Sequence, residues 1–404
     1  MTSPQPGLPV LVLNSGSSSL KYQLVVPGSG DVLAAGTVER IGEPSGLITH
    51  RTGGQAYPSE RRIADHGAAL AELEREFAEH GPDLDQAGVF AVGHRVVHGG
   101  SRFSDPVVVD DDVLAEIDEL SALAPLHNPG ALAGIRAAQE RFAAVPHVVV
   151  FDTAFFATLP PAASTYAIPR ELAEQHRIRR YGFHGTSHQF VSDAVATFLQ
   201  REPTELNQVV LHLGNGCSAS AVRGGVAVDT SMGLTPLQGL VMGTRSGDVD
   251  PSLHSFLHTQ AGLDVAEIDT LLNKQSGLKG LAGVNDFREL DRLRGEGDEH
   301  AQLAFDVYVH RLKHYLGAYL VQLGRLDALT FTAGVGENNA LLRGAVVAGL
   351  EGLGLEIDPE RNESPGGSAR VISTDSSRTT ILVVPTNEEL AIARQALALV
   401  GSTH

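Results

Sequence analysis

Two similar stretches, separated by about half the chain, constrain the fold more than any other feature of the sequence. VLVLNSGSSS (10–19) and VVLHLGNGCSAS (209–220) each start as an apolar, strand-like run and continue into small Gly and Ser residues. They superpose at an offset of 200 residues, which places Leu13 on Leu213. An alternating segment follows each copy, so each predicts a β-hairpin whose bare tip permits close backbone approach.

This repeat has two interpretations. Taken alone, it is explained equally well by two unrelated hairpin turns or by a duplication that produced two similar lobes. The length of 404 residues favours more than one domain. A duplication predicts two lobes that face each other across a cleft, with a boundary near residue 150.

Strand-like and helix-like segments are mixed along the whole chain, so we expect the α/β class. Strands rich in Val, Leu or Phe are expected at 9–14, 145–151, 208–213, 226–230, 327–333 and 379–385. Helices are expected at 66–79, 111–123, 129–142, 187–200, 264–273, 298–323, 340–350 and 388–400. Helix caps are expected at Asn128 before Pro129, at Thr186 with Gln189, and at Thr386 with Glu389.

The charge balance limits the partners of the chain. It carries 48 acidic and 30 basic side chains, a formal net charge of −18, which disfavours nucleic acids and anionic membranes as partners. An anionic substrate therefore needs a local cluster of Arg and Lys that overcomes the repulsion from the whole molecule.

Cysteine usage and the start of the sequence indicate a compartment. Cys217 is the single cysteine, so no intrachain disulfide forms, as is usual in a reducing environment. The opening MTSPQPGLPVLVLNSG lacks a basic segment, and no run in the chain approaches about 18 apolar residues. We therefore expect a cytoplasmic protein.

Three glycine-rich turns, at 15–19, 214–219 and 331–339, each follow a strand of the buried type. Backbone N–H groups of such turns, and of the helix expected from Ala340, can hold phosphate oxygens, and Lys21 closely follows the first turn. None of them matches the P-loop pattern, and the second lacks the helix that a dinucleotide-binding fingerprint requires. Each turn alone is typical of a plain connection, whereas the three together favour a nucleotide site.

Two arginines lie in small-residue loops where no helix face accounts for them. Arg95 is in HRVVHGG (94–100) and Arg245 is in TRSGDVDP (244–251). A guanidinium group binds carboxylate or phosphate oxygens with two parallel hydrogen bonds, so both are candidate anion clamps. The alternative for each is a solvated surface charge.

The histidines have functional and structural interpretations. His184 lies near the expected start of a helix, where developing negative charge is stabilised, and the alternative is a hydrogen-bonded core histidine. The i,i+4 pairs His94/His98 and His184/His188 lack the Glu or Cys partners that a zinc site requires. We therefore do not expect zinc.

Two acidic residues are candidates for phosphate chemistry. Asp152 ends an apolar strand, the position from which α/β proteins present catalytic groups. Glu388 lies in the first turn of the last expected helix, where it either complements the helix dipole or supplies an oxygen to Mg²⁺ beside phosphates.

Together these segments resemble the acetate kinase family, within the sugar kinase/Hsp70/actin superfamily, nearly from end to end. The motifs that carry the resemblance are NSGSSSLKY (14–22), HRVVHGG (94–100), PLHNP (125–129), FDTAFF (151–156), RYGFHGTSH (180–188), HLGNG (212–216), DTSMGLTPLQGLVMGTRSGDVDP (229–251), FTAGVGEN (331–338) and PTNEEL (385–390). The set is specific, which no single motif would be.

The resemblance implies an architecture. Two duplicated ribonuclease-H-like (actin-like ATPase) lobes are expected around a central cleft. The N-terminal lobe is expected over 1–153, with the C-terminal helix 388–404 packed back on it, and the nucleotide-binding lobe over 154–387. The family also implies a homodimer.

The resemblance further implies a role for each candidate residue. Asn14 and Glu388 are expected to bind Mg²⁺, with Mn²⁺ as a substitute. The expected catalytic residues are Asp152, His184 and Arg245. The acid is expected to bind at Arg95, Val97, Leu126, Phe183 and Pro236. The nucleotide, ATP or ADP, is expected at Lys21, His212, Leu213, Gly214, Asn215, Gly216, Asp286, Phe287, Arg288, Gly334, Val335, Gly336, Glu337 and Asn338.

The implied reaction is the reversible, Mg²⁺-dependent transfer of a phosphoryl group from ATP to acetate, which gives acetyl phosphate and ADP by direct in-line displacement. A carboxylate is already a nucleophile, so positioning and charge neutralisation matter more than a strong base. Three alternatives stay open: a propionate or butyrate kinase, a relative that uses pyrophosphate, and a nucleotide-binding module without catalysis.

Overall fold

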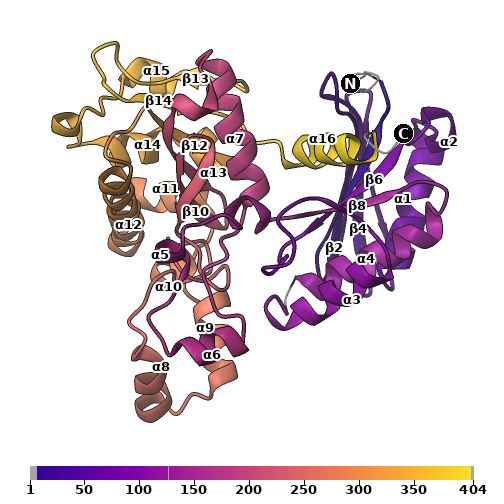
Figure 1. The fold of residues 1–404 in the computed structure, drawn as a ribbon, viewed down its shortest axis with the longest axis horizontal. Helices are drawn as coiled ribbons and strands as arrows, with labels where there is room; N and C mark the ends of the chain where they lie inside the picture. Colours follow the sequence, from indigo (N-terminus) through magenta and orange to yellow (C-terminus); the bar gives the residue numbers. More distant parts are fainter. Residues whose placement is uncertain (1–6, 126, 402–404) are drawn as a thin grey trace. The chain divides into compact units, whose positions relative to one another are not determined.

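The computed structural model describes residues 7–125 and 127–401. Contacts divide the chain into two compact units, the first formed by Met1–Ala157 and Asn387–His404 and the second by Thr158–Thr386. Each unit contains one β-sheet with helices packed on it (Figure 1).

The first unit contains an eight-stranded mixed sheet. Its strands are β1 (Val10–Ser15), β2 (Ser19–Val26), β3 (Asp31–Glu39), β4 (Gly46–Thr52), β5 (Gln55–Arg61), β6 (Ala91–Val96), β7 (Val107–Val108) and β8 (His147–Phe151). Their order is β5-β4-β3-β2-β1-β6-β8-β7. Strands β1 to β5 form antiparallel pairs, β1, β6 and β8 run parallel, and β7 is antiparallel to β8.

The second unit contains a six-stranded mixed sheet. Its strands are β9 (Asn207–Leu213), β10 (Cys217–Arg223), β11 (Val226–Thr230), β12 (Ala328–Thr332), β13 (Arg370–Val371) and β14 (Thr380–Val383). Their order is β11-β10-β9-β12-β14-β13. Strands β9 to β11 pair antiparallel, β9, β12 and β14 run parallel, and β13 is antiparallel to β14.

The two sheets share one topology. The order β3-β2-β1-β6-β8-β7 corresponds strand for strand, in direction and in chain order, to β11-β10-β9-β12-β14-β13, and the β4–β5 hairpin extends the first sheet only. Two unrelated hairpins would not reproduce the pairing of four further strands. The repeat is therefore a duplication, and the predicted fold class is confirmed.

The register of the repeat differs from the sequence superposition. Both hairpins have a three-residue turn, between Ser15 and Ser19 in one copy and between Leu213 and Cys217 in the other. These strand ends correspond at an offset of 198 residues, not 200. The predicted match of Leu13 with Leu213 is thus wrong by two residues, because matching Gly and Ser letters does not fix where the strands end.

The helices of the first unit cover both faces of its sheet. They are α1 (His66–His80), α2 (Leu84–Ala87), α3 (Asp111–Glu119), α4 (Asn128–Arg141) and α16 (Glu388–Gly401). Leu11 and Leu13 of β1 belong to a core cluster with α1 and α4. Val10, on the opposite face of the same strand, lies beside Gly93 and Ile392, where α16 packs. The alternation of side chains along β1 thus separates the two helical layers.

The second unit holds the remaining helices. They are α5 (Pro161–Ser164), α6 (Arg170–Gln175), α7 (Gly185–Phe198), α8 (Leu253–Phe256), α9 (Val265–Lys274), α10 (Gly277–Ala282), α11 (Phe287–Gly295), α12 (Glu299–Leu323), α13 (Ala333–Asn338), α14 (Ala340–Val347) and α15 (Pro359–Glu363). Among the described residues, no helix combines the length and the apolar character needed to span a membrane.

Every predicted strand and helix corresponds to an observed element, but strands β3 to β7 and β13 were not predicted. Arg95, which was expected in a loop, therefore lies in strand β6. The segment 331–339, expected as a turn before a helix, contains the short helix α13. Ala333 begins α13 with a positive φ of 63°, so the chain turns sharply from β12 into it.

The expected cap at Asn128 is wrong. Asn128 is the first residue of α4 and makes no capping bond; His127 precedes it at the cap position. The Asn128 side chain instead accepts a hydrogen bond from His98 N at 3.2 Å and donates one to His98 O at 3.0 Å. It therefore fixes the loop that follows β6.

The two expected threonine caps are also wrong. His184 occupies the cap position of α7, and Thr186 Oγ1 is buried without a hydrogen-bond partner in the described part of the chain. At α16, the Asn387 side chain accepts a hydrogen bond from Leu390 N at 2.9 Å, whereas Thr386 Oγ1 bonds to Ser187 Oγ. Neither threonine thus caps its helix: Thr186 lies inside α7, and Thr386 bonds to Ser187, which is far away in the sequence.

We predict that Gly93→Ala will destabilise the protein by about 1–3 kcal/mol, as overpacked cores do. A Cβ atom at Gly93 would lie 2.8 Å from Ile392 Cγ2 of α16, so the helix must shift. Urea denaturation measures the cost. In an Ile392→Ala background the same change should cost less, because the clashing methyl group is gone. An equal cost in both backgrounds would contradict the packing.

Candidate active site

Three neighbouring parallel strands of the first unit lead to Asn14, Arg95 and Asp152. Asn14 and Arg95 lie near the carboxyl ends of β1 and β6, and Asp152 directly follows β8. The registers of β1 with β6 and of β6 with β8 put all three side chains on one face at the same edge of the sheet. The parallel arrangement therefore gathers residues that are far apart in the sequence.

Arg95 and Asp152 form a two-pronged ion pair. Arg95 Nε donates to Asp152 Oδ1 at 2.9 Å, and Arg95 Nη2 donates to Asp152 Oδ2 at 2.5 Å. Asp152 is 1% exposed, so its charge depends on this partner. Burial acts to lower the pKa of Arg95, but the neighbouring Asp152 and Glu388 outweigh it and raise the pKa, which keeps the guanidinium charged.

The pair leaves part of the guanidinium available. Arg95 Nη1 makes one further long bond, at 3.5 Å, to Asn14 Oδ1. A guanidinium group has five N–H bonds. The hydrogen bonds to Asp152 and Asn14 use three of them, so Nη1 and Nη2 each keep one N–H directed away from Asp152. These two donors form a fork suited to a carboxylate or phosphoryl oxygen.

Glu388 reaches this cluster from α16. Its Oε2 lies 3.6 Å from Arg95 Nε. The helix is held by the cap at Asn387 and by close packing of Ile392 on Gly93 of β6. Burial raises the pKa of Glu388 to about 7; Asp152 also acts to raise it, and Arg95 acts to lower it.

Lys21 completes the group on the adjacent strand. It lies directly opposite Asn14 in the β1–β2 register and is exposed. Residues opposite each other in an antiparallel pair point to the same face. The first unit thus brings together Asn14, Lys21, Arg95, Asp152 and Glu388, as the sequence predicts.

The oxygens of this group suit a hard cation. Asn14 supplies an amide oxygen, and Asp152 and Glu388 supply carboxylates, the ligand types that Mg²⁺ binds together with water and phosphate. Among residues 7–125 and 127–401, no group of three or more His, Cys, Asp or Glu side chains could hold a metal ion. A cation here would therefore depend on few protein oxygens, which is the usual situation for Mg²⁺ at phosphates.

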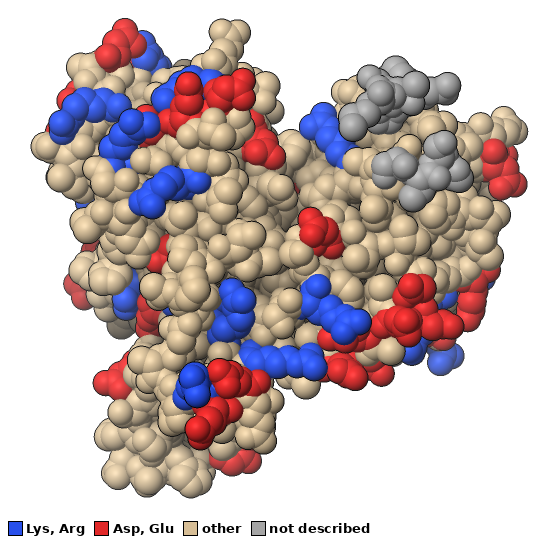
Figure 2. All heavy atoms as spheres, in the orientation of Figure 1, with Lys and Arg blue, Asp and Glu red and all other residues tan. Residues whose placement is uncertain are grey.

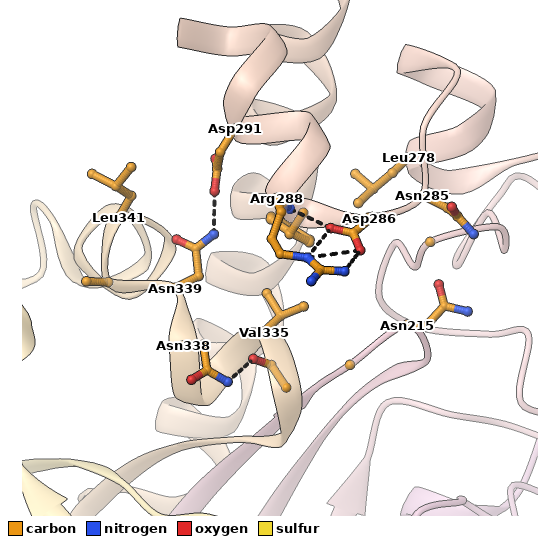
Figure 3. A pocket seen from close by; sticks show the side chains of 15 residues that line it. Asn215, Leu278, Asn285, Asp286, Arg288, Asp291, Val335, Asn338, Asn339 and Leu341 are labelled. Carbon is orange, nitrogen blue, oxygen red and sulfur yellow. Dashed lines mark hydrogen bonds and ion pairs between the residues drawn. The ribbon is translucent and has the colours of Figure 1, made fainter. Parts of the chain in front are cut away.

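The second unit contains a cavity of about 780 Å³ beside the tip of the β9–β10 hairpin (Figure 3). This volume is within the range of small-molecule and cofactor sites. The lining residues are Gly214, Asn215, Gly243, Leu278, Asn285, Asp286, Phe287, Arg288, Asp291, Gly334, Val335, Asn338, Asn339, Ala340 and Leu341.

The cavity includes part of the predicted nucleotide set. The eight residues that line it are Gly214, Asn215, Asp286, Phe287, Arg288, Gly334, Val335 and Asn338. Those that do not line it are Lys21, His212, Leu213, Gly216, Gly336 and Glu337. Glu337 instead accepts a hydrogen bond from Thr386 N at 3.2 Å, and burial raises the pKa of its carboxyl group.

Asp286 and Arg288 form an ion pair at one wall of this cavity (Figure 3). Asp286 caps α11, and the hydrogen bond from the Arg288 side chain is the main reason that the pKa of Asp286 falls to about 2. Arg288 is 92% exposed, so this pair contributes little to stability. An exposed guanidinium group can rotate toward a ligand.

His184 is held in an unusual conformation beside the hairpin. It has a positive φ of 59°, at the cap position of α7, a conformation that costs a non-glycine residue about 1–3 kcal/mol. Its Nδ1 lies 2.9 Å from Ser218 Oγ, and its ring stacks on His212 with centroids 4.3 Å apart. His212 Nδ1 in turn bonds to Ser187 Oγ at 2.8 Å.

Arg245 approaches His184 across Gly216. A Cβ atom at Gly216 would lie 3.4 Å from His184 Nε2 and 3.7 Å from Arg245 Nη1, so the bare backbone of the turn lets both groups come close. Arg245 Nη1 donates to Pro236 O at 3.2 Å. Burial lowers the pKa of Arg245, which is the expected effect on a cation partly removed from water.

The loop that carries Arg245 is irregular but anchored. Between 231 and 252 it has no helix or strand. Asp248 Oδ1 accepts a hydrogen bond from Gly239 N at 3.0 Å, and Asp248 Oδ2 accepts one from Tyr315 Oη at 2.7 Å. A glycine is required at position 239, where φ is 111°. The loop therefore presents Arg245 from a fixed backbone.

The other residues predicted to bind the acid, apart from Arg95, lie in both units. Val97 is half-buried in the loop after β6, next to the backbone of His98 that Asn128 fixes. Phe183 is buried and Pro236 is half-buried in the second unit. Leu126 lies outside the described residues. A common pocket for these side chains stays a prediction.

Sequence reasoning missed three polar residues near His184. Ser218, Ser220 and His188 are fully buried and linked by hydrogen bonds. The available signal was the i,i+4 spacing of His184 and His188, which was considered only as a zinc pair and rejected as one. Residues four apart lie on one face of a helix, so the spacing is also explained by two histidines that hydrogen-bond to a neighbouring strand.

Comparisons with known proteins agree with this geometry. The chain matches the Acetokinase family over residues 9–394. A protein of Clavibacter michiganensis subsp. michiganensis (strain NCPPB 382) named acetate kinase is 60% identical over 391 residues, which cover 96% of this chain and 98% of that protein.

Two solved structures are similar over nearly the whole chain. An acetate kinase of Porphyromonas gingivalis has a TM-score of 0.93 and 41% identity, with 97% of this chain and 100% of that chain covered. A propionate kinase of Francisella tularensis subsp. tularensis SCHU S4 has a TM-score of 0.92 and 42% identity, with coverages of 97% and 99%. The chain belongs to the acetokinase family.

Proposed function

We propose that this chain is an acetate kinase, which transfers the γ-phosphoryl group of ATP reversibly to acetate and gives acetyl phosphate and ADP. The observation that carries the proposal is the 60% identity, over nearly the full length, to a protein with that name. The charged residues that such a reaction needs are present, and they are oriented by hydrogen bonds or ion pairs within each unit.

In this proposal, Arg95 and Asp152 orient the acceptor acid. The buried Asp152 carboxylate fixes the plane of the Arg95 guanidinium, and the remaining N–H fork binds the carboxylate of acetate or an oxygen of the moving phosphoryl group. An acetate oxygen then forms a bond to phosphorus while the bond from phosphorus to the ADP oxygen breaks. The carboxylate needs no base, because it carries no proton to remove.

The charge that develops on the phosphoryl oxygens requires donors in fixed positions. His184 and Arg245, which flank Gly216, supply an imidazole edge and a guanidinium group. Positioned donors of this kind stabilise a transition state more than the ground state, because their geometry is fixed before the reaction. Cavity residues such as Asn215 and Asp286 would bind the nucleoside of ATP.

We propose that Asn14 and Glu388 hold Mg²⁺, with Asp152 positioning the metal and Mn²⁺ as a substitute. The hard oxygen donors beside Arg95 support this assignment. When bound, the ion would neutralise phosphate charge. The chain's own contribution is to keep these oxygens near Lys21 and Arg95.

A hydroxamate assay tests the function. Acetate, ATP, Mg²⁺ and hydroxylamine should give acetyl hydroxamate and ADP, whereas a nucleotide-binding module without catalysis would give none. Propionate and butyrate should react less well than acetate, since an added methylene changes binding by about 1–3 kcal/mol.

A faster rate with propionate would instead support a propionate kinase, as the similarity to the Francisella enzyme allows. Activity with pyrophosphate and release of orthophosphate would support the third alternative.

We also propose a cytoplasmic homodimer. The single cysteine, Cys217, is a buried free thiol, which is consistent with a reducing compartment. The homodimer is what the resemblance to the acetate kinase family implies. Sedimentation velocity distinguishes a dimer from a monomer of 42.6 kDa.

We predict that Arg245→Ala will lower kcat by about 10³-fold or more, as expected for an arginine that acts on a phosphoryl transition state. Arg245→Lys keeps the positive charge but loses the fork, so it should recover only part of the rate. Steady-state kinetics of both variants give the comparison. A kcat for Arg245→Ala near that of the wild type would refute the role.

The pKa of Glu388, raised by burial to about 7, predicts a pH dependence for Mg²⁺. A protonated carboxyl group is a poor ligand, so the KM for Mg²⁺ should rise as pH falls, by up to about tenfold per pH unit below 7. Glu388→Gln cannot ionise, so its KM should be high and less pH-dependent. Protonation of the ATP phosphates affects the wild type and Glu388→Gln equally, so the difference between the two slopes reports on Glu388. The same slope in both would contradict the assignment.

A further inference from the structure

A series of buried side chains ends at His184 in the second unit. Ser220 Oγ lies 2.8 Å from His188 Nδ1, and His188 Nε2 lies 2.7 Å from Ser218 Oγ. Ser218 Oγ lies 2.9 Å from His184 Nδ1. Ser218, Ser220 and His188 are completely buried, so water does not compete for these bonds.

The number of available protons restricts which group donates in each hydrogen bond of this series. Each hydroxyl donates one proton, and a neutral imidazole has one N–H. Burial, with His212 nearby, lowers the pKa of His188 well below its usual value, so the ring is neutral. If Ser218 accepted from both histidines, its own proton would be buried without an acceptor, so it donates to one of them and accepts from the other.

Ser220 selects between the two directions. In the described part of the chain, His188 Nδ1 is the one hydrogen-bond partner of the Ser220 side chain. If His188 donated to Ser220, the Ser220 proton would be buried without an acceptor, which costs more than an unused lone pair on a hydroxyl oxygen. Ser220 therefore donates to His188 Nδ1.

This choice determines the other bonds. The proton of His188 is then on Nε2 and is donated to Ser218, and Ser218 donates its own proton to His184 Nδ1. His184 Nδ1 is an acceptor, so the proton of the neutral ring is on Nε2. That nitrogen is the one that approaches Gly216, on the side where Arg245 Nη1 also lies.

We propose that Ser220, His188 and Ser218 are positioning residues that hold His184 as the neutral tautomer with a proton on Nε2, aimed at an oxygen of the moving phosphoryl group. This inference rests on the proposed kinase function. None of the three residues touches the reacting atoms; they act through His184.

The surroundings of His184 agree with a neutral ring. A second proton on Nδ1 would have to be donated to Ser218, which would reverse each bond and leave the Ser220 proton unused. The cation Arg245 lies beside the same turn, and His212 stacks on the ring. A nearby cation disfavours protonation of the imidazole.

Nitrogen NMR of the full-length protein tests the tautomer without any activity measurement. With ¹⁵N-labelled histidine, and with His184→Gln used to assign the signals, the wild type should show His184 protonated at Nε2 and unprotonated at Nδ1 near neutral pH. A proton on Nδ1 of His184 would overturn the proposal. The tautomer is read from the wild type, and no variant of Ser218, Ser220 or His188 is needed for it.

A pair of variants tests the consequence for catalysis. Ser218→Ala removes the donor to Nδ1 and should lower kcat by about 10- to 100-fold, with the KM for ATP changed by less than about threefold, as expected when an orienting partner is lost. Ser218→Thr keeps the hydroxyl group and should stay within about threefold of the wild-type kcat. In Ser218→Ala the His184 signals should show a mixture of tautomers.

The kinase function and the positioning role of Ser218 can be refuted separately. If the wild type forms no acyl hydroxamate from any of the acids tested, the proposed function is wrong, whatever the NMR result. If the wild type is active but Ser218→Ala retains wild-type kcat, the positioning proposal is wrong and the kinase assignment stands. A reduced kcat in both Ser218 variants, with an unchanged His184 tautomer, would likewise overturn it and indicate a packing effect.

Discussion

The ion pair between Arg95 and Asp152 is the interaction on which the first unit's site depends. A carboxylate that is 1% exposed is stable only if its partner neutralises it, and removal of one partner from such a pair typically costs about 3–5 kcal/mol. Replacement of both by apolar residues is often harmless, so stability alone does not account for the pair. Its effect here is to fix one edge of a guanidinium group and leave the other edge available for an anion.

The local placement of Arg95 compensates for the negative net charge of the chain. A chain with a net charge of −18 repels phosphates as a whole, so each phosphate-binding group must act locally. Arg95 is kept charged by its acidic neighbours, while Arg245 is half-buried and hydrogen-bonded to the Pro236 carbonyl. Glycine at 216 lets His184 and Arg245 approach the same turn. Positioning of a few cations, not a strong base, is thus the chemistry that the residues offer.

Much of the fold could be predicted from the sequence, because apolar strands such as 147–151 and 328–332 are buried along their whole length. The hairpin repeat indicated the duplication correctly, but its register was wrong by two residues, since strand ends depend on pairing with neighbours. The expected caps at Asn128 and Thr386 failed for a related reason, because residues distant in the sequence bind these side chains. The Asn128 side chain does not cap its helix, because it bonds to the backbone of His98, 30 residues away.

Site residues that belong to a sequence motif could be predicted. Residues whose role depends on a contact with a distant residue could not. Arg95 and Asp152 could each be named, but their mutual bond joins residues 57 positions apart and follows only from the parallel register of β6 and β8. Ser220 gave no signal at all, because its importance comes from a single bond to a buried ring. Periodicity reports which side chains are buried, not which of them are bonded.

The central claim is that the phosphoryl group passes directly from ATP to the acid, with these residues as fixed donors and no covalent intermediate on the protein. The stereochemical course of the transfer tests it most directly, with ATP made chiral at the γ-phosphorus by three oxygen isotopes. A single in-line displacement predicts inversion of configuration in the acyl phosphate. Retention would reveal two successive displacements through a phosphorylated residue and would contradict the account.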